Sequence, residues 1–160
     1  MPLEIGSNAP DFTLMNQDRQ PVTLSTVLQN GPVVLAFVPA AFSSVCQTEL
    51  CTFRDSLATL GSSQAQVLGV STDTFFTLKA WGDQQRFGFP LLSDYNKDVI
   101  RSYGVVNPDM IGLKDIAKRA VFVIGRDGMI KHTEVLDDAR NEPNYYKVRT
   151  ALASLSASTT

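Results

Sequence analysis

The chain has 160 residues, of which 44% are hydrophobic and 19% charged, and its formal net charge is −2 at pH 7. This balance is typical of one globular domain over 1–160 with a sizeable core, and it gives no reason to expect a nucleic acid or a membrane as partner. No apolar run approaches the ~20 residues that cross a bilayer, and the N-terminus lacks a secretory signal, so we expect a cytoplasmic protein.

Strand-like and helix-like segments alternate along the chain. Strands are predicted as a pair around a polar turn in 11–25, as a buried β-branched run at 32–39, as apolar runs at 65–71 and 89–94, and as a late hairpin in 119–135. Helices are predicted at 44–60, 74–88, 97–104 and 141–155, before a small polar tail at 154–160 that we expect to fray. This order predicts an α/β sandwich with a mixed sheet.

The only two cysteines of the chain, Cys46 and Cys51, lie together on the helix that follows the first buried strand. A preceding serine, Ser43 or Ser44, can cap this helix and place Cys46 in its first turn, where free amides and the helix dipole favour a thiolate. Cys46 also falls on the apolar stripe of the helix, so a purely structural cysteine stays open. Glu49 opposes a thiolate, and an activating cation would have to come from elsewhere in the chain.

The spacing of the two cysteines argues against thioredoxin-type exchange and against a disulfide within an intact helix. Thioredoxin-type exchange uses a C-x-x-C pair, whereas Cys46 and Cys51 are separated by four residues. On a helix they lie roughly 140° and ~7.5 Å apart, too far for a disulfide while the helix stays intact. They are therefore either two unrelated thiols or a redox couple whose helix unwinds. A zinc site needs four ligands, and two cysteines with His132, which we expect to face solvent from its strand, fall short. We expect no metal.

The segment around Cys46 resembles the active-site signature of the peroxiredoxins, P-x3-[TS]-x2-C, here Pro39, Ser43 and Cys46. Three other segments resemble the same family: "APDFTL", "FPLLSD" and "RAVFVIGRDGMI", in which Arg119 matches the arginine that the family places beside its reactive cysteine. The segments "AAFSSVCQTELC" and "LKAWGDQQRFGFPLLSD" are similar to the alkyl hydroperoxide reductase E branch. Cys51 resembles the resolving cysteine of the PrxQ (bacterioferritin comigratory protein) branch.

The resemblance implies a thioredoxin-like fold with an N-terminal β-hairpin extension, and a thiol peroxidase for hydrogen peroxide and organic hydroperoxides. Cys46 would be the peroxidatic cysteine, and Arg119 and Ser43 would stabilise the reacting atoms.

The same resemblance assigns supporting roles and partners. Pro39 would shield the site from water, and Glu49 would brace Arg119. Cys51 would resolve the sulfenic acid of Cys46 as an intramolecular disulfide, which thioredoxin or a similar dithiol reduces without a cofactor, in a monomer or a homodimer. A one-cysteine peroxidase using an external thiol, a thiol-disulfide oxidoreductase and a redox sensor are the alternatives.

Overall fold

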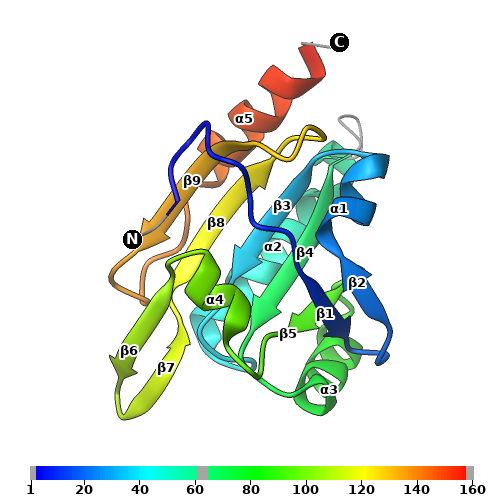
Figure 1. The fold of residues 1–160 in the computed structure, drawn as a ribbon. Coiled ribbons are helices and arrows are strands. Elements are labelled where there is room, and N and C mark those ends of the chain that lie inside the picture. The colour runs from blue at the N-terminus through cyan, green and yellow to red at the C-terminus, as the bar shows by residue number, and fades with distance from the viewer. Residues whose placement is uncertain (1–2, 61–64, 158–160) are drawn as a thin grey trace.

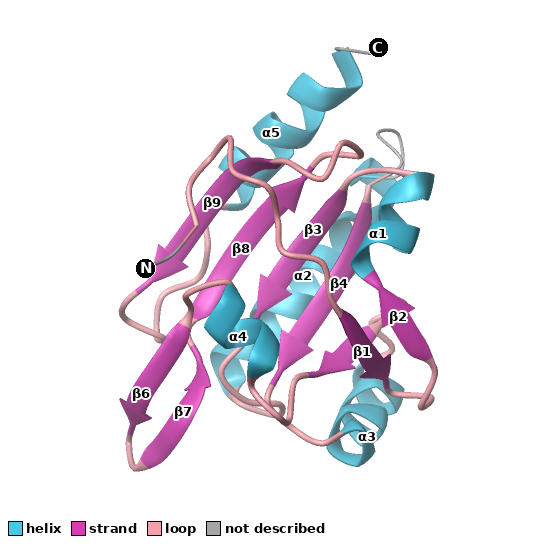
Figure 2. Ribbon diagram, in the orientation of Figure 1, coloured by secondary structure: helices cyan, strands magenta, loops and turns pink. Residues whose placement is uncertain are grey.

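The computed structural model describes residues 3–60 and 65–157, and Figures 1 and 2 show a twisted sheet with helices on both of its faces. The strands are β1 (Thr13–Asn16), β2 (Pro21–Thr23), β3 (Val33–Phe37), β4 (Gln66–Ser71), β5 (Leu91–Ser93), β6 (Val106–Met110), β7 (Leu113–Ala117), β8 (Arg119–Ile124) and β9 (Ile130–Leu136). The helices are α1 (Leu24–Val27), the 3-10 turn η1 (Leu28–Asn30), α2 (Ser44–Leu60), α3 (Phe75–Gln85), α4 (Asp98–Ser102) and α5 (Tyr145–Ala157).

Among the described residues, seven strands form one mixed sheet in the order β2-β1-β5-β4-β3-β8-β9. Strands β3, β4 and β5 are parallel, β8 runs antiparallel to β3, and β9 runs antiparallel to β8. The β1–β2 hairpin adds to β5 through β1. The mixed sheet and the N-terminal hairpin that the sequence predicted are confirmed.

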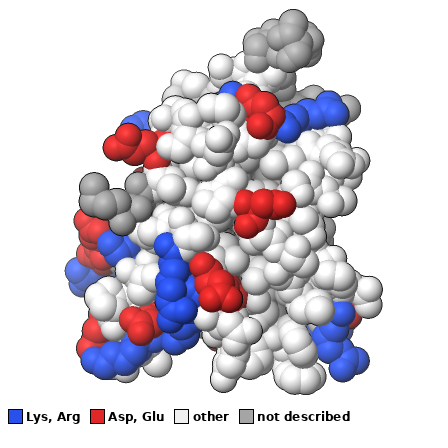
Figure 3. Space-filling model, in the orientation of Figure 1, with Lys and Arg blue, Asp and Glu red and all other residues white. Residues whose placement is uncertain are grey.

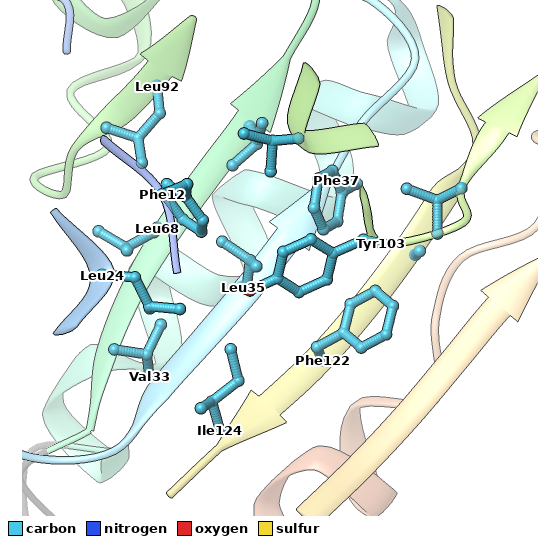
Figure 4. Close-up of a cluster of buried hydrophobic side chains, with 14 of the residues drawn as sticks. Phe12, Leu24, Val33, Leu35, Phe37, Leu68, Leu92, Tyr103, Phe122 and Ile124 are labelled. Carbon is cyan, nitrogen blue, oxygen red and sulfur yellow. The ribbon is translucent and has the colours of Figure 1, made fainter. Parts of the chain in front are cut away.

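The central strands are buried on both faces, so alternate residues of β3 enter two separate cores. Val33, Leu35 and Phe37 point to the face that carries α1 and α4, whereas Val34 and Ala36 point to the face covered by α2, α3 and α5. In the first core, Phe37, Tyr103 and Phe122 pack edge-on or tilted with ring centroids 5.3–5.8 Å apart (Figure 4).

The second core lies between the sheet and helices α2 and α3. Leu78 and Trp81 form the inner face of α3, whereas Phe76 is 68% exposed. Trp81 is fully buried and packs edge-on against Phe87, with ring centroids 4.9 Å apart, so it belongs to this core.

Several predicted boundaries are wrong for local reasons. The helix predicted at 74–88 ends at Gln85 because Arg86 adopts a left-handed backbone, and the helix predicted at 141–155 begins only at Tyr145. The hairpin β6–β7 and the short helix α1 were not predicted. Helix α5 continues to Ala157, and the rest of the expected frayed tail lies outside the described residues, as do the side chains of Leu57 and Leu60 on the predicted stripe of α2.

The sheet topology brings distant parts of the chain to one edge. The carboxyl ends of the parallel strands β3, β4 and β5 meet there, and because β8 is antiparallel to β3, its first residues lie beside the end of β3, with Ala120 opposite Phe37. In open α/β sheets this edge is where functional groups collect. On the face seen in Figure 3 both positive and negative side chains appear, as expected for a formal net charge of only −2.

Candidate active site

The first turn of α2 carries Cys46, as the sequence predicted. The helix begins at Ser44, so Ser43 and not Ser44 is the residue before it, and the first helical hydrogen bond runs from the Gln47 amide to the Ser43 carbonyl at 2.9 Å. Cys46 is fully buried, and its thiol lies where the free amides at the start of the helix favour negative charge.

The segment between β3 and α2 places the other two residues of the signature. Pro39 is buried two residues after the end of β3. The Ser43 hydroxyl donates a hydrogen bond to the Ala40 carbonyl at 2.9 Å. This bond uses the hydroxyl proton, so toward any further partner the Ser43 oxygen can act only as an acceptor.

Arg119, the first residue of β8, is the cation next to Cys46. Its Nη2 donates to the Cys46 Sγ at 3.3 Å and to the Ala139 carbonyl at 2.9 Å, and its Nε donates to that same carbonyl at 3.1 Å. The side chain is only 2% exposed, so these bonds are shielded from water. Burial opposes the charge of Arg119, but the sulfur of Cys46 and the carboxylate of Glu49 outweigh it and raise the pKa of Arg119 above its usual value.

Glu49 is the third member of this buried group. It lies on the turn of α2 after Cys46, and its Oε2 accepts a hydrogen bond from Arg119 Nη1 at 2.7 Å. Burial raises the pKa of Glu49 to about 7, although Arg119 acts in the opposite direction. The second oxygen, Oε1, is buried and has no hydrogen-bond partner among the described residues. The guanidinium group is thus shared between a thiol and a carboxyl group that titrates near neutral pH.

Cys51 faces a different neighbour. Its thiol is half-buried and lies 3.7 Å from Oε1 of Gln85 on α3, whereas Cys46 faces β8. Both thiols are free and belong to one continuous helix. The structure therefore agrees with the expectation that no disulfide joins these two residues while α2 is intact.

Comparison with known proteins shows to which family the chain belongs. The family model described as "AhpC/TSA family" matches residues 5–133, well over half of the chain. The chain belongs to this peroxiredoxin family. Alkyl hydroperoxide reductase E of Mycobacterium tuberculosis is 39% identical to this peroxiredoxin over 135 residues, which cover 83% of the chain and 86% of the relative. A chloroplastic 2-cysteine peroxiredoxin of Chattonella marina var. antiqua is 35% identical over 145 residues, 84% of this chain and 72% of the relative.

Solved structures show the same relation. The crystal structure of peroxidoxin BcpB from Mycobacterium tuberculosis superposes with a TM-score of 0.85 at 32% identity and covers 99% of both chains. A peroxiredoxin-like protein from Aquifex aeolicus gives a TM-score of 0.84 at 26% identity over 97% of this chain and 89% of that one. The peroxiredoxin therefore has the thioredoxin-like fold, and it is a thiol-dependent peroxidase that reduces peroxides.

One residue of the peroxiredoxin lies differently from what its sequence suggested. His132 was expected to face solvent, but it is half-buried, and burial lowers its pKa. The described residues hold no group of three or more side chains that could bind a metal ion, and none of their helices combines the length and apolar character of a membrane span.

The sequence did not indicate which backbone carbonyl contacts Arg119 or which side-chain amide contacts Cys51. The Ala139 carbonyl, which accepts two bonds from Arg119, carries no side-chain signal, and Gln85 could be linked to Cys51 only once the packing of α3 against α2 was known.

Proposed function

We propose that Cys46 is the peroxidatic cysteine and that Arg119 is its activating cation. The observation that carries the proposal is the buried guanidinium group, which donates to the Cys46 sulfur at 3.3 Å while Glu49 and the Ala139 carbonyl fix its orientation. An arginine held in this way supplies charge without reorganising during the reaction. Arg119 also offsets the effect of Glu49, whose negative charge opposes a thiolate, because the guanidinium group that stabilises the thiolate also binds the Glu49 carboxyl group.

The reaction follows from these groups. The Cys46 thiolate attacks one oxygen of hydrogen peroxide or an organic hydroperoxide, the S–O bond forms and the O–O bond breaks. The bonding electron pair leaves on the second oxygen, which takes up a proton and departs as water or an alcohol. Cys46 is thereby oxidised by two electrons to a sulfenic acid, and the peroxide is reduced.

The neighbouring groups hold the peroxide during this step. Arg119 polarises the oxygens, and the free amides near Val45 and Cys46 donate to the departing oxygen. The Ser43 oxygen accepts the hydrogen bond of the peroxide O–H, because its own proton is already donated to the Ala40 carbonyl. Buried Pro39 limits the access of water to the site.

We further propose that Cys51 resolves the sulfenic acid. The first turns of α2 unwind, the Cys51 thiol attacks the Cys46 sulfur, a disulfide forms and water leaves. The cost of opening one end of a helix is within the range of ordinary local fluctuations. A dithiol protein of the thioredoxin type then reduces the disulfide and is itself oxidised. The active species is a monomer or a homodimer, which sedimentation of the reduced protein distinguishes.

Intact-mass measurement after one equivalent of peroxide tests both parts of the proposal. A loss of two hydrogen atoms identifies an internal disulfide, and a Cys51→Ser variant should instead gain one oxygen atom. A gain of one oxygen by the unsubstituted protein contradicts resolution by Cys51 and supports a one-cysteine peroxidase that uses an external thiol. If Cys46→Ser still consumes peroxide at the rate of the unsubstituted protein, the assignment of the nucleophile is wrong.

A further inference from the structure

The segment between β3 and α2 is held from the side by an acidic residue that follows β4. The Oδ2 atom of Asp73 accepts a hydrogen bond from the backbone amide of Ala41 at 2.7 Å. Ala41 lies between Pro39 and Ser43, in the turn that leads into the first turn of α2. The contact therefore connects the loop after β4 to the segment that carries the proposed peroxide-binding groups.

Asp73 is itself fixed by two strands. Ser71, at the end of β4, is 1% exposed, and its hydroxyl donates to the same Oδ2 atom at 2.8 Å. The Ser71 hydroxyl also accepts from the Asp73 amide at 3.2 Å, and the Ser93 hydroxyl at the end of β5 donates to the Asp73 carbonyl at 2.6 Å. The Asp73 carboxylate thus fixes the Ala41 amide relative to the end of β4.

The turn that Asp73 holds is a strained one. Phe42, directly after Ala41, has a φ of 66°. Residues with a side chain avoid this left-handed region because Cβ approaches the backbone, and such strain persists only where the surroundings enforce it. Two contacts hold this turn: the bond from the Ala41 amide to Asp73, and the Trp81 ring, whose centroid lies 6.1 Å from that of the Phe42 ring.

We propose that Asp73 is a positioning residue for peroxide reduction. By holding the Ala41 amide against the strain at Phe42, it sets the position of the Ser43 oxygen and of the first amides of α2 relative to Arg119. This inference rests on the proposed role of Cys46, because it concerns the binding of peroxide at the same sulfur. Groups that stabilise a transition state have to be held within a fraction of an ångström, and an error of about 1 Å can reduce the rate by ~10²-fold.

The rate of peroxide reduction and the rate of Cys46 alkylation together distinguish a positioning role of Asp73 from other roles. Reduction of peroxide needs both the thiolate and the correctly placed donors, whereas alkylation of Cys46 by iodoacetamide depends on the thiolate and its accessibility. We expect Asp73→Ala to lower the second-order rate with peroxide by ~10- to 100-fold, with the alkylation rate little changed. Asp73→Asn keeps a carbonyl oxygen that can accept from both Ala41 and Ser71, so it should retain most of the peroxide rate.

Controls make each outcome decisive. Asp83→Asn removes a carboxylate from an exposed ion pair with Lys79 on α3 and should change neither rate. If Asp73→Ala does not fold, Ser71→Ala is the alternative, since it removes one anchor of the carboxylate, and it should lower the peroxide rate several-fold without affecting alkylation. An unchanged peroxide rate in Asp73→Ala, or an equal loss of both rates, overturns the inference, and so does an Asp73→Asn variant as slow as Asp73→Ala.

Cys46→Ser, measured beside these variants, separates this test from that of the proposed function. If Cys46→Ser is inactive and Asp73→Ala reacts normally, only the role of Asp73 is wrong. If Cys46→Ser stays active, the nucleophile is wrong and the positioning of this segment has no catalytic meaning.

Discussion

Replacing Arg119 by methionine removes the cation from the buried group while keeping much of the side-chain volume. At the 3.3 Å that separates Nη2 from Sγ, a unit charge interacts with a thiolate by about 5 kcal/mol for an effective dielectric constant of about 20. Arg119 stabilises the thiolate before the reaction as well as the transition state. The part of the energy that is equal in these two states does not accelerate the step. We therefore expect the second-order rate of peroxide reduction to fall by ~10²-fold or more, as it does when one electrostatic stabiliser is lost.

The assay is single-turnover oxidation followed by stopped flow, together with the ultraviolet absorbance of the thiolate as a function of pH. In the Arg119→Met protein the thiolate fraction at neutral pH should fall. Arg101→Met is the matched control, because Arg101 lies on the surface of α4 with its side chain 58% exposed, and its loss should leave both measurements unchanged.

Loss of stability is the main competing explanation for a slow Arg119→Met protein. Breaking a buried ion pair commonly costs about 3–5 kcal/mol, since the remaining partner stays buried. Protonation of Glu49, whose pKa lies at about 7, limits this loss, and the double variant Arg119→Met with Glu49→Gln leaves no charge behind. The double variant should recover stability without recovering the rate. An unchanged rate and an unchanged thiolate absorbance in Arg119→Met would refute the role of Arg119.

Three further predictions concern the cysteines and Glu49. Cys46→Ser should abolish peroxide consumption, because a serine hydroxyl is not ionised at neutral pH and cannot act as the nucleophile. Cys51→Ser should keep the first oxidation but lose turnover with thioredoxin, and excess peroxide should convert Cys46 to sulfinic acid; wild-type turnover would make Cys51 a core residue only. The pKa of Glu49 rises from 4.5 to about 7 on folding, so its contribution to stability is present below pH 4.5 and is lost as the pH rises to about 7. The urea midpoint of the unsubstituted protein should therefore fall between pH 4.5 and about 7, and this fall should be absent in Glu49→Gln. An equal fall in both proteins would contradict the argument that burial raises the pKa of Glu49.

The parts of the fold that could be predicted from sequence are those with a strong periodic signal. The β-branched run of β3 and the apolar stripe that contains Cys46 and Leu50 gave the central strand and the active-site helix. The hairpin β6–β7 gave no such signal, because Pro108 and Asp109 interrupt its first strand and its tight turn places Ile111, a β-branched residue, at a φ of 48°. Such turns are normally recognised by Asn-Gly, and here Gly112, with a φ of 91°, supplies only the second half of that signal.

The active site was predictable to a similar extent. The motif and the later match at Arg119 pointed to the proposed nucleophile and its proposed cation, because both are side chains in recognisable segments, and the structure places these two side chains in contact. The contacts that fix them were not predictable, since the Ala139 carbonyl and the Asp73 bond to Ala41 depend on which loops meet at one edge of the sheet. The sequence also placed Glu49 against the thiolate as an opposing charge, and only its burial shows that it titrates near neutral pH.

The separation of Cys46 and Arg119 along the chain links the reactivity of the thiol to the completion of folding. Arg119 is 73 positions after Cys46 and begins the strand that pairs with β3, and the carbonyl that orients it lies a further 20 positions on. During synthesis, α2 is complete long before either group leaves the ribosome. If Arg119 has the proposed activating role, an unfinished or misfolded chain carries Cys46 without its cation. In that mechanism the thiol becomes a fast target for peroxide only when β8 has joined the sheet, so chains that have not yet folded are less exposed to oxidation by the substrate of the mature enzyme.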